Sequence, residues 1–139
     1  MKLIYYADDD LDDLKFFREA AEGSGFIVVV FFTGQALLDT LTASPKKPDI
    51  IFMDVRMPIA EGDQILKEIK RSLAYRKIPV VIISGPLHQN QVERYLSDGA
   101  DFIMTKKSSM ALFKINLHEV LDKDWENYRP QLSDFRDLG

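Results

Sequence analysis

Five short apolar segments alternate along the chain with longer segments in which apolar residues recur every three or four positions. The apolar segments are almost continuously hydrophobic, which is typical of strands that are covered on both faces. The longer segments carry one-sided apolar stripes, such as Ile65, Ile69 and Leu73, which predict amphipathic helices. Strict alternation of the two predicts an α/β fold with a five-stranded parallel sheet and helices on both faces. The predicted strands are residues 3–7, 26–32, 50–53, 78–83 and 102–104.

Four of the five predicted strands end in a side chain with useful chemistry. In open parallel sheets, ligands bind beyond the carboxyl ends of the strands, so these side chains are expected at one edge. Two carboxylates about 5 Å apart repel by roughly 3 kcal/mol at an effective dielectric constant near 20, which favours a bound cation between them. The oxygen ligands suit Mg²⁺, and a lysine suits a phosphoryl oxygen. The pattern therefore predicts a site that places a phosphoryl group on an aspartate. The strand-end residues are Asp8 and Asp9, Asp54, Ser84 and Lys106.

Composition and charge argue against several other classes of protein. The net charge of −4 argues against sequence-independent binding of nucleic acid. The absence of cysteine excludes disulfides and thiolate zinc sites. The apolar runs are too short to span a bilayer, and the N-terminus lacks a signal-peptide pattern, so no membrane association and a cytoplasmic location are expected.

The remaining aspartates near the N-terminus have a simpler interpretation. Asp10, Asp12 and Asp13 lie where the first helix should begin, and capping and the helix dipole explain acidic residues there. At the other end, residues 125–139 lose the apolar periodicity and contain Pro130. We therefore expect one domain over residues 1–124 and an extended tail over 125–139, packed through Trp125 and Tyr128.

Ordered motifs from residue 2 to about 122 resemble the receiver domain of two-component response regulators, of the stand-alone type. The motifs are "ADDD" at 7–10, "DIIFMDVRMP" at 49–58 followed by Gly62, "VVIISG" at 80–85 and "GADFIMTK" at 99–106. Ser84 and Lys106 follow Asp54 by 30 and 52 positions, which agrees with the family's spacing. The resemblance implies a flavodoxin-like sheet with strand order 2-1-3-4-5.

The resemblance also implies a role for each strand-end residue. Asp54 would be the phosphoacceptor, and Ser84 and Lys106 would bind the phosphoryl group. Asp8 and Asp9 would form an acidic pair that holds the ion, with Asp9 favoured over Asp8 as the direct ligand. The implied Mg²⁺ ligands are Asp8, Asp9, Asp54 and the backbone carbonyl of Arg56.

Some positions depart from the family pattern. Lys107 stands where a proline with a cis peptide bond is usual, so a trans bond is expected before it. Ile103 stands at the usual aromatic switch position and cannot report phosphorylation by ring rotation. Arg56 and Pro86 occupy the two positions that tune phosphate lifetime, and neither activates water well. Slow self-dephosphorylation is therefore expected.

The leading hypothesis is a phospho-accepting signalling module that takes its phosphoryl group from a sensor histidine kinase or a phosphotransfer protein. Phosphorylation would change the face made by the fourth helix, fifth strand and fifth helix, which would bind a downstream protein target or form a homodimer. The alternative is a pseudo-receiver that binds partners without phosphorylation. An aspartyl phosphatase is disfavoured because Arg56 replaces its second acid, and flavin binding is disfavoured because aspartates replace its phosphate loop.

Overall fold

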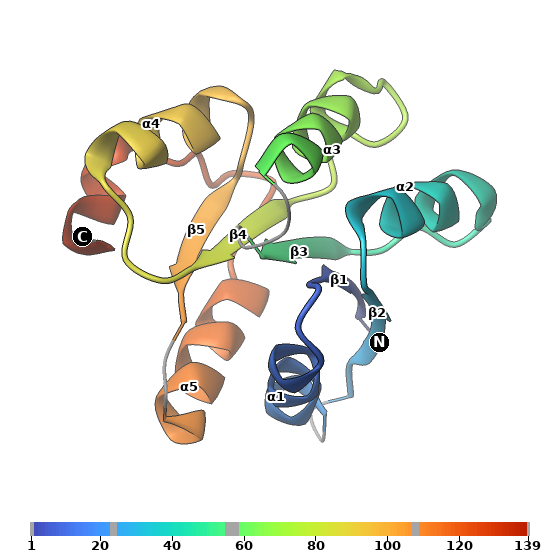
Figure 1. Cartoon of the computed structure of the whole chain (residues 1–139), viewed down its shortest axis with the longest axis horizontal. Coiled ribbons are helices and arrows are strands. Elements are labelled where there is room, and N and C mark those ends of the chain that lie inside the picture. Colours follow the sequence, from blue (N-terminus) through green and yellow to red (C-terminus); the bar gives the residue numbers. More distant parts are fainter. Residues whose placement is uncertain (1, 23–24, 55–58, 107–108, 139) are drawn as a thin grey trace.

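The computed structural model, which describes residues 2–22, 25–54, 59–106 and 109–138, is a three-layer α/β sandwich. A five-stranded parallel sheet has the order β2-β1-β3-β4-β5. Helices α1 and α5 cover one face of the sheet, and α2, α3 and α4 cover the other (Figure 1). The predicted architecture and strand order are confirmed. The elements are β1 Leu3–Ala7, α1 Leu11–Ala21, β2 Ile27–Phe31, α2 Gly34–Ala43, β3 Ile50–Asp54, α3 Ile59–Arg71, β4 Val80–Ser84, α4 Gln89–Ser97, β5 Phe102–Thr105, α5 Met110–Leu121 and η1 Leu132–Leu138.

The strands are apolar throughout because both faces of the sheet pack against helices. Successive residues of β1, such as Tyr5 and Tyr6, belong to different apolar layers. One layer joins the sheet to α2, α3 and α4, and the other joins it to α1 and α5. The observed strands differ from the predicted ones only at their ends. Strand β4, for example, begins after Pro79, which has no N–H to donate to a ladder.

Capping side chains set the start of the helices beside the carboxyl edge of the sheet. Asp10 caps α1 by accepting a hydrogen bond from the amide of Asp13 over 3.0 Å, and Ser109 caps α5 through the amide of Leu112. The helix-start interpretation is thus confirmed for Asp10. It places α1 directly after the end of β1, with only a short connection between them.

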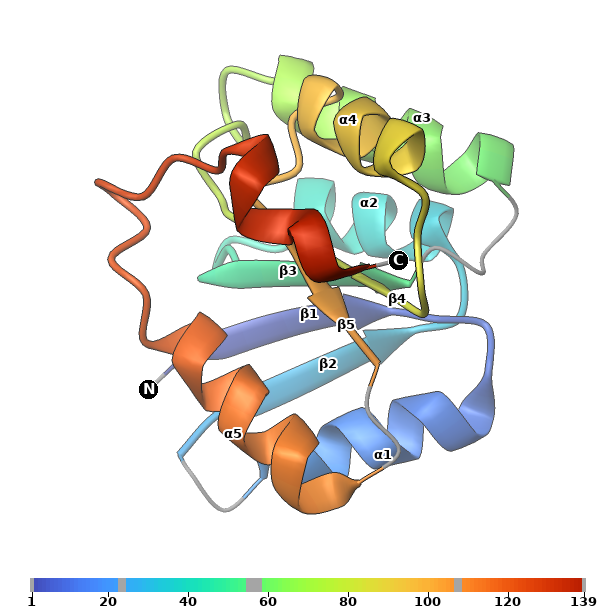
Figure 2. The ribbon, with the colours of Figure 1, turned by 90° about the vertical axis from the view of Figure 1, so that its left-hand side faces the viewer.

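The C-terminal segment packs on the sheet and is not simply extended. Residues 132–138 form a 3₁₀ helix beside β5 and α4 (Figure 2). The ring of Phe102 contacts the rings of Trp125, Tyr128 and Phe135 at centroid distances of 6.4, 6.0 and 5.2 Å. Phe135 is 2% exposed and belongs to the apolar layer of α2, α3 and α4. The expected packing through Trp125 and Tyr128 is confirmed, whereas the expectation of an extended tail is wrong for residues 132–138.

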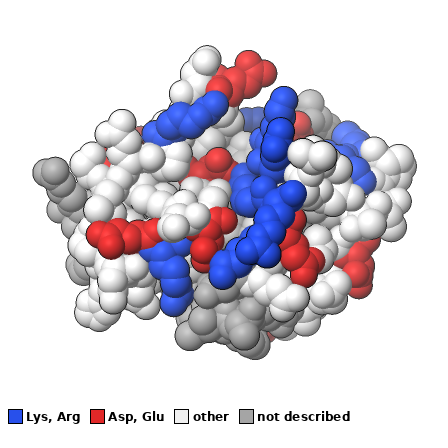
Figure 3. Space-filling view, turned by 90° about the horizontal axis from the view of Figure 1, so that it is seen from above, with Lys and Arg blue, Asp and Glu red and all other residues white. Residues whose placement is uncertain are grey.

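Acidic and basic side chains are mixed on the face above the sheet, over α2, α3 and α4 (Figure 3). In the part of the chain that the structure describes, no helix combines the length and the apolar character needed to cross a bilayer.

Candidate functional site

The parallel register brings the ends of four strands to one edge of the sheet. Ala7 of β1 pairs with Met53 of β3, so Asp8 and Asp54 both follow directly on that pair. Asp54 pairs with Ile83, and the next residue of β4, Ser84, pairs with Thr105 of β5. The predicted convergence of strand-end side chains is therefore observed.

Lys106 lies among three carboxylates at this edge. Its Nζ is 2.8 Å from Oδ2 of Asp54, 2.7 Å from Oδ2 of Asp13 and 3.7 Å from Oδ2 of Asp8. The side chains of Asp8 and Asp54 are fully buried, whereas those of Lys106 and Asp13 are 24% and 30% exposed. The cluster is thus a buried acidic pair closed on its solvent side by a lysine–aspartate ion pair.

Asp8 is held by hydrogen bonds to both of its oxygens. The hydroxyl of Tyr6 donates to Oδ2 over 2.5 Å, and the amide of Asp10 donates to Oδ1 over 2.9 Å. Burial raises the pKa of Asp8 above its ordinary value of 3.8, and the neighbouring Asp54 carboxyl raises it further. Both causes disfavour a negative charge on Asp8 unless a cation comes close to it.

The donor set fits a small divalent ion. One oxygen from each of Asp8, Asp13 and Asp54 lies within 4.8 Å of the others. Oxygens around an octahedral Mg²⁺ lie about 2.9 Å apart when adjacent and about 4.2 Å apart when opposite, so oxygens of this cluster would move toward one another to share an ion. Carboxylate oxygens are the ligands that Mg²⁺ prefers. The residues present therefore fit the metal that the sequence predicted.

The structure joins some of the predicted site residues and leaves others apart. Asp9 is exposed and does not belong to the cluster of three carboxylates, so its ligand role stays a prediction. Arg56, whose carbonyl was a predicted ligand, and Lys107 lie outside the described residues. Asp13, interpreted from the sequence as a helix-start acid alone, instead directs its carboxylate at Lys106.

Ser84 lies at the same edge with its hydroxyl turned to the backbone. It is 2% exposed, and its Oγ donates a hydrogen bond to the carbonyl of Gly85 over 2.7 Å. A serine hydroxyl has a single proton to donate. Bonding to a phosphoryl oxygen would therefore require rotation about the Ser84 side chain.

Sequence reasoning missed Tyr6 and Asp13, although signals for both were present. Tyr6 lies two positions before Asp8 on the same side of its strand, and a buried tyrosine hydroxyl generally needs a partner. Asp13 directly precedes Leu14 and lies four positions before Phe17, at the border of the apolar stripe of its helix. Both positions could have been predicted to face the strand ends.

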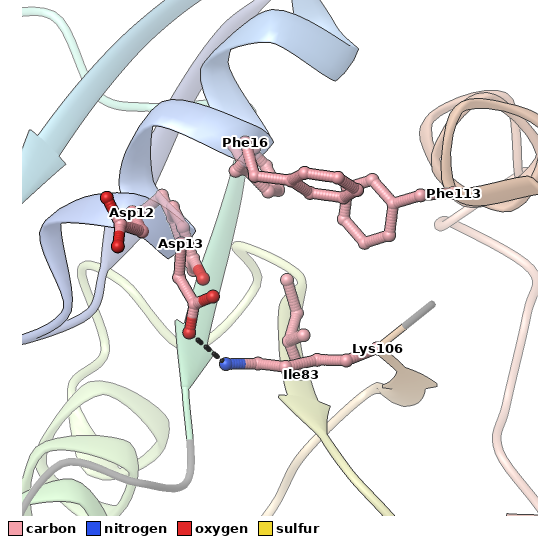
Figure 4. A pocket seen from close by; sticks show the side chains of 8 residues that line it. Asp12, Asp13, Phe16, Ile83, Lys106 and Phe113 are labelled. Carbon is pink, nitrogen blue, oxygen red and sulfur yellow. Dashed lines mark hydrogen bonds and ion pairs between the residues drawn. The ribbon is translucent and has the colours of Figure 1, made fainter. Parts of the chain in front are cut away.

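A pocket of about 260 Å³ opens between α1 and α5 beside Lys106 (Figure 4). Aromatic side chains of the two helices form one side, and the Asp13–Lys106 pair forms the other. The pocket leads from solvent to the exposed part of the acidic cluster. Its lining residues are Tyr6, Asp12, Asp13, Phe16, Phe17, Ile83, Lys106 and Phe113.

Comparisons with known proteins agree with the fold. The phosphorylated cyanobacterial phytochrome response regulator RcpA superposes with a TM-score of 0.77 at 22% identity, over 93% of this chain and 96% of RcpA. The Mn²⁺-bound form of response regulator Rcp1 gives a TM-score of 0.76 at 19% identity, over 94% of this chain and 100% of Rcp1. These two structures support the fold.

Sequence relatives extend the agreement to the family. The polar-differentiation response regulator DivK of Brucella anthropi is 28% identical over 112 residues, which is 81% of this chain and 89% of DivK. The family model described as the response regulator receiver domain matches residues 4–118, which run from the second residue of β1 into α5. The chain therefore belongs to the response regulator receiver domain family.

Proposed function

We propose that this receiver domain accepts a phosphoryl group on Asp54 in an Mg²⁺-dependent reaction. The observation that carries the proposal is the position of Asp54. Its buried carboxylate ends β3 with Lys106 at 2.8 Å and lies in one cluster with Asp8. A strand-end aspartate with no chemical role would not require a second buried carboxylate and an ammonium group beside it.

The chemistry divides among the residues at the edge. An oxygen of Asp54 forms a bond to phosphorus while the bond from phosphorus to the donor's histidine nitrogen breaks, and the electron pair stays on that nitrogen. Bound Mg²⁺, held by Asp8 and Asp54, would offset the negative charge between the carboxylate and the incoming phosphoryl group. Lys106 places its ammonium where the phosphoryl oxygens would lie, and Ser84 offers one hydroxyl proton.

The proposed donors are a sensor histidine kinase or a phosphotransfer protein, in a cytoplasmic setting. The DivK and RcpA relatives are both response regulators by name, which supports a donor of this kind. The Mn²⁺-bound form of Rcp1 supports a divalent cation as the proposed cofactor. Slow loss of the phosphoryl group, inferred from Arg56 and Pro86, stays a prediction, and Arg56 lies outside the described residues.

The proposed output surface is the face of α4, β5 and α5, and the C-terminal segment is part of it. Ile103 is buried at the position of the usual aromatic switch, whereas the ring of Phe102 contacts the segment that follows α5. Gln89 at the start of α4 donates a hydrogen bond to the carbonyl of Phe135 over 3.3 Å. We therefore propose that residues 1–124 and 125–139 present this surface together to a downstream protein, or to a second copy of the chain.

The main alternative is a pseudo-receiver that binds partners without phosphorylation. To separate the two, the purified protein is incubated with acetyl phosphate and Mg²⁺ and its intact mass is measured. We expect the mass to rise by one phosphoryl group in the parent protein, and not to rise in EDTA or in Asp54→Asn. Asp12→Asn should still gain the group, since Asp12 is exposed and outside the cluster. An unchanged mass with Mg²⁺ present would favour the pseudo-receiver.

A further inference from the structure

Lys106 has two close carboxylate partners that come from different elements. Asp54 lies at the end of β3, and Asp13 lies in the first turn of α1, 93 positions away from Lys106 in the chain. The two N–O distances are nearly equal at 2.8 and 2.7 Å. Figure 4 shows the side chains of Asp13 and Lys106 pointing toward one another along one side of the pocket. The lysine is thus fixed from two sides.

Helix capping accounts for the amide of Asp13 but not for its side chain. The amide donates to Oδ1 of Asp10, which is the N-cap of α1. An acidic residue at the third helical position commonly accepts a hydrogen bond from the amide of the N-cap residue in return. Here that amide of Asp10 donates to Asp8 instead. The carboxylate of Asp13 is directed at Lys106, where it forms an ion pair.

The two partners of Lys106 have different fates during phosphoryl transfer. The attacking oxygen of Asp54 becomes part of an acyl phosphate, so Asp54 ceases to be a free carboxylate. Asp13 is not altered by the reaction. A lysine has a flexible four-carbon stem and a strongly hydrated head, so an ammonium with no second partner would move into solvent. The phosphoryl oxygens become partners of the ammonium only after transfer, whereas the Asp13 carboxylate is its partner both before and after.

We propose that Asp13 is a positioning residue that holds the Lys106 ammonium beside Asp54 before and after phosphoryl transfer. The inference rests on the proposed function for its catalytic consequence, but not for the contact itself. It assigns to Asp13 a role that is distinct from helix capping. It also predicts that Asp13 acts on the reaction through Lys106.

The contact is tested first in the unphosphorylated protein by NMR of the lysine ammonium groups. An ammonium held by two carboxylates exchanges its protons slowly with water, so Lys106 is expected to give a signal in the parent protein. The signal should be lost in Asp13→Asn and kept in Asp12→Asn, because Asp12 is exposed. A signal that survives Asp13→Asn would overturn the proposal, whether or not the protein accepts a phosphoryl group.

The consequence is tested by the rate of phosphorylation with acetyl phosphate at saturating Mg²⁺. Asp13→Asn is expected to slow the reaction about tenfold, which corresponds to about 1.4 kcal/mol of barrier. In a Lys106→Gln background the same substitution should cause no further slowing, because its effect passes through the lysine. Equal slowing in both backgrounds would show that Asp13 acts directly and would contradict the proposal. Thermal unfolding of each variant confirms that it is folded.

Discussion

Replacing Asp8 by asparagine should stabilise the metal-free protein while removing its response to Mg²⁺. The oxygens of Asp8, Asp13 and Asp54 lie within 4.8 Å of one another, which gives repulsions of about 3.5 kcal/mol per pair at an effective dielectric constant near 20. Lys106 at 3.7 Å attracts Asp8 by about 4.5 kcal/mol on the same scale. The two repulsions exceed the attraction by roughly 2.5 kcal/mol, and burial adds to the cost of the charge.

An asparagine side chain in place of Asp8 would keep its shape but only one oxygen, so it could accept the hydrogen bond from Tyr6 or the one from the amide of Asp10, and not both. Part of the hydrogen-bond energy is lost with the charge, so the free energy of unfolding should rise by about 2 kcal/mol. For a domain of this size, that corresponds to a rise of about 6 °C in the melting temperature. A change of this size is large enough to be measured by circular dichroism.

The assay is thermal unfolding at pH 8, first in EDTA and then with saturating Mg²⁺. The parent protein should melt higher with Mg²⁺, because a ligand that binds only the folded state stabilises it. Asp8→Asn should melt higher in EDTA and show little further change with Mg²⁺. Asp12→Asn is the matched control and should behave like the parent. A lower melting temperature for Asp8→Asn in EDTA, or an unchanged response to Mg²⁺, would show that this balance of charges is wrong.

Three further predictions concern the pKa of Asp8, the hydroxyl of Tyr6 and the C-terminal segment. Because the pKa of Asp8 is raised above 3.8, the contribution of Asp8 to the free energy of unfolding should fall as pH rises from 3.8 through the raised pKa in metal-free protein. Urea unfolding across pH should show this slope in the parent and not in Asp8→Asn; equal slopes would contradict it. Tyr6→Phe keeps the ring stacked on Phe17 but removes a donor to a buried carboxyl, so it should cost about 1 to 2 kcal/mol in urea unfolding. An unchanged midpoint would argue against that hydrogen bond. Phe135→Ala should cost about 3 kcal/mol, whereas Leu132→Ala, at a 39% exposed position, should cost much less. Equal effects of these two changes on urea unfolding would mean that Phe135 is not the anchor of the segment.

Much of the fold could be predicted because the strands and helices carry different apolar periods. Continuous runs such as 80–84 are buried on both faces, and parallel strands must end at a common edge. That geometry places Asp8 and Asp54 at the same edge, and the pairing of β1 with β3 makes them neighbours. The resemblance to a known family then added the strand order and a role for each residue at the edge, and the family and the strand order are confirmed.

The direction of individual side chains could not be read from the sequence in the same way. Asp12 and Asp13 are neighbours in sequence, yet one is exposed and the other forms an ion pair with Lys106, because a helix turns by about 100° per residue. The end of the chain shows a different limit. Phe135 is a single apolar residue in a polar segment and has no periodicity, so only the packed structure reveals that it joins the core.

A crystal structure of the protein with Mg²⁺ and beryllofluoride would be the most decisive test of phosphoryl acceptance at Asp54. We expect a metal ion bound by Asp8 and Asp54, and beryllofluoride on an oxygen of Asp54. We also expect the Lys106 ammonium within hydrogen-bonding distance of both a fluorine and Asp13. A structure in which Lys106 stays on an unmodified Asp54, with no ion at Asp8, would rule against a phospho-accepting role.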